Sequence, residues 1–518
     1  MMNRTVKIAV AAFLSLSVME SAAKVTLPQI YTDNMVVQQK DRAPFHGKAS
    51  PGSTVWIAAG WLKHQVSVNV GADGRWDVVL PTPKGGKKGF EVTFTDAADG
   101  SGVTLHNVAA GEVWLCSGQS NMEMPLAGWG KVVNYEQEIA GAVYPQIRLL
   151  QVKRRTDMVP QDDTEVTGGG WQVCSPQSVE EFSSIAYFFA RSLWEELDVP
   201  VGVIDCTWGG SPIEAWLGYA TLSEAKGFKG VVEDFRGEEL ADGTIRAHYK
   251  ALLERHDSGE SPVAAVDSAA YAHKDGFPGT IDGHTFYPAE LYNAMLRPLS
   301  RLGIKGVLWY QGENNGDRAG QYDCLFPRLI NDWRELWGNC DMPFYFVQLA
   351  NWRERKDVQP HSDWAYLRES QQKVLHMPNT AMAVAVDLGD ADDIHPKNKQ
   401  EVARRLALIA LCRDYGKKTE WRAPNYDDYV VEGDTMYLTF DAPARDFMPN
   451  ERLDGFIVAG TEGVFYKADA RWVGDRLAVS APQVKVPVAV RYAWADNPKV
   501  SLRGKTGLPV APFRTDKW

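Results

Sequence analysis

Residues 113–122 read Val113-Trp114-Leu115-Cys116-Ser117-Gly118-Gln119-Ser120-Asn121-Met122, a short apolar run that ends in a turn of small and polar residues. Continuous apolar runs of this length are typical of strands buried on both faces of a parallel sheet. The five runs of this kind together predict an α/β fold with a five-stranded parallel sheet. The other four are Val201 to Asp205, Gly306 to Tyr310, Phe344 to Leu349 and Met382 to Val386.

The segments between these runs carry helical patterns. Within residues 182–197, Ile185, Phe189, Leu193 and Leu197 recur at helical spacing. Residues 322–337 and 400–415 are two further helix candidates. Helices of this kind are expected to cover both faces of the sheet, which gives three layers. Residues from about 219 to 287 are polar and weakly periodic, and we interpret them as an insertion, mostly loop with a short helix.

The two flanking regions have a β pattern, with short strand candidates separated by turn signals. This pattern predicts a β-sandwich-like N-terminal domain over residues 24–110, an α/β domain over 111–424 and a similar β domain over 425–518. The clearest strand candidates are residues 35–37, 53–57, 76–80, 436–440 and 486–492.

The first 23 residues have the features of a signal peptide. Arg4 and Lys7 precede an apolar segment over residues 8–18, and Ser21 to Ala23 suit a cleavage site. We therefore expect a secreted or periplasmic protein. No later apolar stretch is long enough for a membrane-spanning helix.

Composition narrows the possible functions of the 518-residue chain. A net charge of −11 disfavours binding to nucleic acid. The six cysteines form no CxxC pair, and neither HExxH nor a phosphate-binding GxxxxGK[ST] occurs, so we expect no metal and no cofactor. Cys116 and Cys206 are predicted to be core residues, and a Cys324–Cys340 pair and the oligomeric state stay open.

Polar residues follow the predicted strands, where open α/β sheets bind ligands. Ser120 follows the first strand, Gly209-Gly210 the second, Gln311 the third and Asp392-Asp393-Ile394-His395 the fifth. A serine, an imidazole, a carboxylate and hydrogen-bond donors are the groups that acyl transfer needs. The alternative for Ser120 is a helix N-cap, and for His395 a surface loop residue. Met122 replaces the second glycine of GxSxG, which argues against an α/β-hydrolase nucleophile elbow.

These motifs resemble the sialate O-acetylesterases, a family of the SGNH hydrolase superfamily. The resemblance covers nearly the whole chain and implies an SGNH-hydrolase-like three-layer core. The blocks that carry it are Gly118-Gln119-Ser120-Asn121-Met122, Trp208-Gly209-Gly210-Ser211, Trp309-Tyr310-Gln311-Gly312-Glu313 and Asp393-Ile394-His395-Pro396, with support from Leu291-Tyr292-Asn293, Asp332-Trp333-Arg334 and Lys397-Asn398-Lys399-Gln400.

The resemblance implies a carbohydrate esterase that removes O-acetyl groups from sialic acids, with an acetylated sugar as its partner. It implies Ser120 as nucleophile and His395 as base. The oxyanion donors would be the amides of Ser120 and of Gly209 or Gly210, with the side chain of Gln311. The expected substrate-binding residues are Asn121, Trp208, Glu313 and Arg368.

Several alternatives stay open. The superfamily spacing selects Asp392 as the acid, the closer family spacing selects Asp393, and some relatives manage without a side-chain acid. Glu313 and Arg368 could instead form an ion pair at the edge of the core. The substrate could be acetylated xylan or another plant glycan, and a non-catalytic carbohydrate-binding protein is the alternative of a different class.

Overall fold

The computed structural model describes residues 25–157, 159–224, 280–281, 284–285, 288–450 and 452–517. The predicted signal peptide and most of the predicted insertion therefore lie outside the described residues. The described parts of the insertion are helix α5 (Tyr219–Glu224) and the paired strands β11 (Thr280–Ile281) and β12 (His284–Thr285).

A mixed but mostly parallel sheet forms the centre of the molecule, which confirms the predicted α/β fold. Along its main path six strands are parallel rather than the predicted five, β9 adds an antiparallel edge strand, and β1 (Val36–Gln38) pairs in parallel with β7 off this path. In spatial order the strands are β15 (Thr380–Val384), β14 (Phe344–Gln348), β13 (Gly306–Tyr310), β7 (Gly102–Gly118), β10 (Val201–Thr207), β8 (Tyr144–Gln151) and β9 (Gln172–Cys174).

Strand β8 was missed because only its second half has the apolar pattern of a buried strand. Residues 147–150 are buried, whereas the first residues contain Pro145 and are exposed or half-buried. Arg148 interrupts the apolar run, and its guanidinium donates to the Pro145 carbonyl. Proline is tolerated near the start of a strand, so the strand begins where the sequence pattern resembles a loop.

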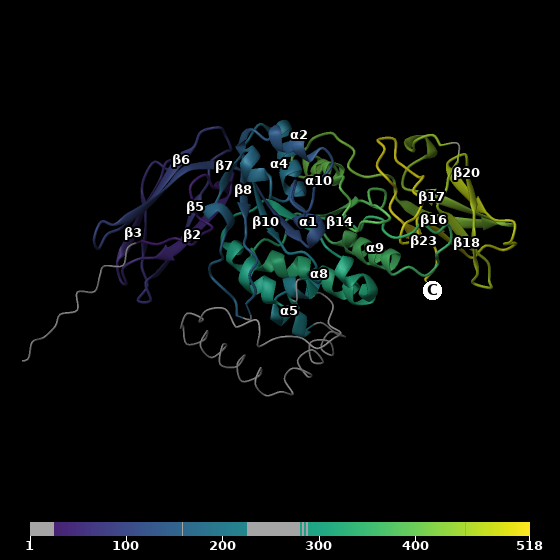
Figure 1. Cartoon of the computed structure of the whole chain (residues 1–518), viewed down its shortest axis with the longest axis horizontal. Helices are drawn as coiled ribbons and strands as arrows, with labels where there is room; N and C mark the ends of the chain where they lie inside the picture. Colours follow the sequence, from purple (N-terminus) through teal and green to yellow (C-terminus); the bar gives the residue numbers. More distant parts are fainter. Residues whose placement is uncertain are drawn as a thin grey trace, which may run out of the picture.

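Helices cover both faces of the sheet, as the helical patterns predicted (Figure 1). On one face α4 (Ser184–Leu197) packs against α10 (Lys399–Arg413), and on the other α8 (Ala319–Leu336) packs against α9 (Asp363–Lys373). Helices α4, α8 and α10 match the three predicted segments. Helix α9 was not predicted, because its residues are largely polar. The short helices are α1 (Ser120–Glu123), α2 (Tyr135–Ala140) and α3 (Pro176–Val179).

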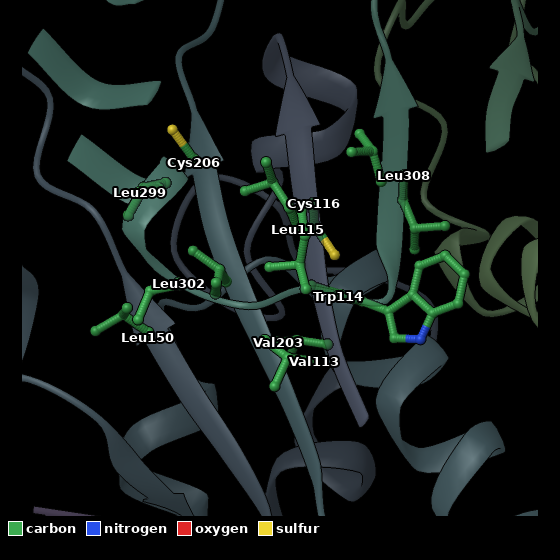
Figure 2. Close-up of a cluster of buried hydrophobic side chains, with 14 of the residues drawn as sticks. Val113, Trp114, Leu115, Cys116, Leu150, Val203, Cys206, Leu299, Leu302 and Leu308 are labelled. Carbon is green, nitrogen blue, oxygen red and sulfur yellow. The ribbon is translucent and has the colours of Figure 1, made fainter. Parts of the chain in front are cut away.

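The buried centre of the sheet is aliphatic and aromatic. Figure 2 shows side chains of neighbouring strands gathered there, including Trp114 of β7, Val203 of β10 and Leu308 of β13. All three side chains are fully buried. Burial of an aliphatic side chain such as valine or leucine stabilises a fold by about 1.5–3 kcal/mol. Cys116 and Cys206 are buried among them, as predicted, and all six cysteines are free thiols.

The N-terminal β region joins the central sheet through a shared strand. It contains β1 (Val36–Gln38), β2 (Arg42–Lys48), β3 (Thr54–Ala59), β4 (Val66–Asn69), β5 (Arg75–Pro81) and β6 (Phe90–Asp96). The first half of β7 pairs with β6 and the second half with β10 and β13. The two β layers meet where Phe45 of β2 contacts Phe94 of β6. The predicted boundary at residue 110 therefore falls inside one strand.

The C-terminal β region has its own apolar core between two four-stranded sheets. One sheet contains β16 (Tyr426–Glu432), β17 (Thr435–Phe440), β21 (Arg476–Ser480) and β20 (Asp469–Val473). The other contains β19 (Phe465–Lys467), β18 (Phe456–Ala459), β22 (Ala489–Tyr492) and β23 (Phe513–Arg514). Leu438 and Leu477 of the first sheet share a core with Val458 and Val490 of the second.

The strand order reverses at the end of β7. After β7 the chain builds β8 and β10 on one side and then β13, β14 and β15 on the other. Open sheets bind ligands where the strand order reverses in this way, at the carboxyl ends of the strands. Within the part of the chain that the structure describes, no helix has the length and apolar character needed to cross a membrane.

Candidate functional site

Ser120 lies in the tight turn that follows β7. Gly118 has a φ of 135°, and a Cβ at this position would come within 2.1 Å of the Tyr310 carbonyl oxygen on the neighbouring strand. Glycine is therefore required there, which explains the glycine before the serine. The Gln119 amide donates to the same Tyr310 carbonyl at 3.0 Å, so the turn is anchored to β13 immediately before Ser120.

The structure brings Ser120 and His395 together across the sheet edge. The Ser120 Oγ lies 2.8 Å from His395 Nε2, which is hydrogen-bond distance. Burial and the nearby Lys399 ammonium lower the pKa of His395, and Asp393 opposes them. The imidazole is therefore neutral at neutral pH and can accept the serine proton, which is the chemistry predicted for this pair.

The two candidate acids differ in where they lie. The Asp393 Oδ1 accepts the backbone amide of His395 at 2.8 Å and lies 3.7 Å from His395 Nδ1. Asp392 is exposed, and its backbone amide donates to the Asp390 carboxylate. Only Asp393 is therefore near the imidazole, at a distance longer than a direct hydrogen bond.

Asn121 joins the loops that carry the serine and the histidine. Its side-chain amide donates to the Ile394 carbonyl at 3.1 Å and to the Glu313 carboxylate at 2.5 Å. Its Oδ1 accepts from the Lys399 ammonium at 2.5 Å. Because Asn121 is buried and all these groups belong to the protein, the structure gives it a positioning role beside Ser120.

Glu313 and Lys399 both bond to the side chain of Asn121, Glu313 through its carboxylate and Lys399 through its ammonium. Burial raises the pKa of Glu313, although Asn121 and Lys399 oppose the shift. Burial also lowers the pKa of Lys399 to about 7, against the attraction of Glu313 and Asp393. Among the described residues, Glu313 bonds to Asn121 and forms no ion pair with Arg368, and its charge acts on Lys399 without a direct contact. One Glu313 oxygen, Oε2, is buried with no hydrogen-bond partner among the described residues.

The glycine turn after β10 lies beside the serine turn. The Trp208 amide donates to the Gly118 carbonyl at 3.1 Å, and Trp208 is half-buried. The Gly209 amide donates to the Glu123 carboxylate, which also pairs with Arg154. Gly210 has a φ of 71°, and no acceptor among the described residues meets its amide. Of the two glycines, Gly210 therefore has the amide that can meet an oxyanion.

The turn after β13 contains two side-chain amides. Gln311 is fully buried, and its amide group donates to the Asn315 Oδ1 at 2.7 Å and to the Ser211 carbonyl at 3.3 Å. Asn314 is half-buried, donates to the Gly210 carbonyl at 2.6 Å and belongs to the 3₁₀ helix η6 (Glu313–Arg318). The Gln119 side chain accepts the Asn314 amide at 3.3 Å, so Asn314 lies between the glycine turn and the serine turn.

Arg368 is a structural residue of the core. It is 0% exposed, and burial lowers its pKa to about 9, against the attraction of Asp496, so it stays charged at neutral pH. Its guanidinium donates to four carbonyl oxygens, at 2.7–3.0 Å, which leaves it unavailable to a sugar in this structure. The four carbonyls are those of Leu349, Ala350, Ala495 and Asp496.

The structure brings together the predicted Ser120, His395 and Asp393, and it adds Asn314 and Lys399, which sequence reasoning did not select. Lys399 was part of the quoted Lys-Asn-Lys-Gln stretch, and the signal for it was a lysine at the first turn of an otherwise apolar helix face. Asn314 directly follows the block that contains Gln311 and Glu313. Among the described residues, no group of three or more histidine, cysteine or acidic side chains is arranged for a metal ion.

The chain is similar to known carbohydrate esterases over most of its length. The family described as carbohydrate esterase, sialic acid-specific acetylesterase, matches residues 110–274 and 279–411, a region that contains every residue of this site. The sialate O-acetylesterases of Mus musculus and Pongo abelii are 30% and 31% identical over 93% of this chain, and the alignments cover 93% and 91% of those proteins. The crystal structure of a carbohydrate acetylesterase from Xanthomonas citri is 33% identical, with a TM-score of 0.78, and covers 95% of this chain and 100% of that chain.

Proposed function

Because this chain belongs to the sialic acid-specific acetylesterase family of carbohydrate esterases, we propose that it removes O-acetyl groups from sialic acids through a serine acyl-enzyme. The observation that carries the proposal is the 2.8 Å contact between Ser120 Oγ and His395 Nε2 at the carboxyl end of β7. The sialate O-acetylesterases named above are similar over nearly their full length, which supports the substrate class.

In the proposed reaction the Ser120 oxygen attacks the acetyl carbonyl carbon while His395 Nε2 takes the serine proton. The tetrahedral intermediate collapses as the sugar oxygen leaves and receives that proton from His395. Water then attacks the acetyl-serine, with His395 again as base, and acetate leaves as Ser120 recovers its proton. A neutral imidazole is needed at the start, and the lowered pKa of His395, caused by burial and Lys399, keeps it neutral at neutral pH.

The oxyanion of each tetrahedral intermediate needs donors that are already in place. We assign this role to the backbone amides of Ser120 and Gly210 and to one side-chain amide from the turn after β13. The amide of Gly209 is engaged with Glu123, which favours Gly210 of the pair. Asn314 is favoured over Gln311, because Gln311 is fully buried with both N–H groups of its side chain in use.

A second candidate substrate is an acetylated glycan such as xylan. The Xanthomonas citri protein, which resembles this chain in structure at 33% identity, is described as a carbohydrate acetylesterase without mention of sialic acid. Both substrates would use the same reaction at Ser120. Residues 1–23 further support export from the cytoplasm, so we place the proposed activity in a secreted or periplasmic enzyme.

The test is acetate release by wild type and Ser120→Ala, from O-acetylated sialic acids and from acetylated xylan oligosaccharides. We expect Ser120→Ala to lower kcat by at least about 10³-fold and to lose labelling by a fluorophosphonate. Ser117→Ala is a matched control, because Ser117 Oγ is also buried at this turn but donates to the Cys206 carbonyl. Stoichiometric labelling of another serine would refute the assignment, and preference for xylan would select the second substrate.

A further inference from the structure

Trp129 is an exposed indole beside the candidate site rather than in the core. Among the described residues, Trp129 and Trp56 are the tryptophans with strongly exposed side chains, at 49% and 45%. Single exposed apolar residues are common on protein surfaces and need no special explanation. Trp56 lies on β3 of the N-terminal region. The position of Trp129 is what distinguishes it.

Trp129 contacts the imidazole that faces the nucleophile. The ring centroids of Trp129 and His395 are 5.2 Å apart, and the ring planes meet at 71°, an edge-on contact. His395 in turn lies 2.8 Å from Ser120 Oγ. An acetyl group that is attacked by Ser120 therefore lies beside this indole, and the ring that bears the acetyl group must lie close by.

The loop that carries Trp129 is fixed on both sides. The Ala127 amide donates to the Glu180 carbonyl at 3.0 Å, and the Val133 amide donates to the Lys397 carbonyl, two residues beyond His395, at 2.9 Å. Within the loop the Gly130 amide donates to the Ala127 carbonyl at 2.9 Å. These bonds hold the indole in place against the histidine loop.

Glycines on either side of Trp129 make this loop conformation possible. Gly128 has a φ of 52°, in the left-handed region that favours glycine. A Cβ on Gly130 would come within 2.1 Å of the Pro125 carbonyl oxygen. The sequence Gly-Trp-Gly therefore places a large aromatic side chain at an exposed position of this tight turn, where burial in the core cannot account for it.

We propose that Trp129 is a sugar-binding platform: its indole stacks on the ring of the acetylated sugar whose acetyl group lies at Ser120. This role rests on the proposed function, because it requires a sugar substrate. The C–H groups on one face of a pyranose ring form a flat apolar surface that matches an indole face. A rigid aromatic ring gains contact area at little cost in side-chain entropy. Ethyl acetate, which has no sugar ring, would gain nothing from this contact.

The test compares Trp129→Ala with wild type on an O-acetylated sugar and on ethyl acetate, with kcat and KM measured separately. We expect a KM for the sugar that is about 3- to 10-fold higher in Trp129→Ala, with kcat nearly unchanged. The kcat/KM for ethyl acetate should stay within about twofold of wild type. Trp129→Phe should restore most of the sugar affinity, because phenylalanine keeps an aromatic face. Trp56→Ala is the matched control for loss of an exposed indole. It should leave kcat and KM unchanged for both substrates.

Two outcomes would overturn the proposal. An equal loss of kcat on both substrates would mean that Trp129 only holds the imidazole in position. Unchanged kinetics on both substrates would mean that the sugar does not contact it. Failure of the proposed function is distinguishable, because wild type itself would then release no acetate from any sugar. Because Trp129 is exposed, Trp129→Ala should fold, which thermal unfolding would verify.

Discussion

Asp393 interacts with two groups of His395, its backbone amide and its imidazole. The carboxylate is 2.8 Å from the amide and 3.7 Å from Nδ1, so its shorter contact stabilises the loop and its longer one acts on the imidazole through charge. Catalytic hydrogen bonds are often long before substrate binds and shorten in the complex. Asp393 is therefore the acid that this geometry favours, which agrees with the closer family spacing.

Asp393→Asn should lower kcat by about 10²-fold, less than the 10⁴-fold of a serine-protease triad, because the Nδ1 contact is not a direct hydrogen bond. Asp393 raises the pKa of His395, so its removal lowers that pKa further. Activity requires neutral imidazole, and the acid limb of kcat/KM should therefore move to lower pH. Asp392→Asn is the matched control and should change kcat less than about twofold. A larger loss in Asp392→Asn would reverse the assignment.

The turn after β13 determines which amide can stabilise the oxyanion. Gln311 is the first residue after β13, and its side chain bonds into the buried polar network of Asn315 and Ser211. Asn314 lies one turn later, where its backbone amide bonds to the Gln119 side chain and its own side chain bonds to Gly210. The two candidates therefore differ in their position after β13, and not in the kind of amide that they carry.

We expect Asn314→Ala to lower kcat by about 10²–10³-fold, with little change in KM, because an oxyanion donor acts mainly in the transition state. Gln311→Ala should instead lower thermal stability, because it removes the side-chain donor to the buried Ser211 carbonyl and one of the two donors to Asn315 Oδ1. Parallel kcat and melting-temperature measurements on the two variants separate these effects. A kcat loss confined to Gln311→Ala would return the oxyanion role to the residue that the sequence pattern selected.

Elements with a strong apolar period were predictable, and elements with polar ends were not. The five predicted strands and helices α4, α8 and α10 exist because each has a continuous or periodic apolar pattern. Strand β8 was missed because Pro145 and Arg148 break its pattern, and α9 because its buried face includes polar residues such as Arg368 and Gln371. Ser120 and His395 were found from their places after strands. Their link through Asn121 and Lys399 was not predictable, because the sequence pattern does not show which buried polar side chains bond to each other.

At the scale of the whole molecule, the central sheet joins the N-terminal region through a shared strand and apolar core, and the C-terminal region through polar contacts. The N-terminal region shares β7 and one apolar core with the central sheet. The C-terminal region joins through the Arg368 contacts with residues 495 and 496 and through Arg503. Arg503 reaches Asp387, at the start of the loop that leads to His395. The C-terminal region therefore supports the loop that carries His395.

Asp387 is the centre of that contact and should make the protein sensitive to acid. Its carboxylate binds Arg405 at 2.6 and 3.0 Å and Arg503 at 2.8 Å, and its side chain is 6% exposed. Burial acts to raise the pKa of Asp387, but the two arginines hold it below its usual value. A carboxyl with a lowered pKa in the folded state adds stability above its unfolded pKa of about 3.9 and loses it as the pH falls through the folded pKa.

Asp387→Asn should therefore lower the free energy of unfolding at neutral pH by about 3–5 kcal/mol, since it leaves two arginines without their shared anion. The difference from wild type should shrink as the pH falls below about 4, where wild type also loses the charge. Asp357→Asn is the matched control, because Asp357 bridges Lys467 and Lys499 at the surface and should cost less than about 1 kcal/mol. Thermal unfolding at neutral and acid pH measures both variants. A difference between Asp387→Asn and wild type that does not change with pH would mean that the stabilising contribution of Asp387 is independent of its charge.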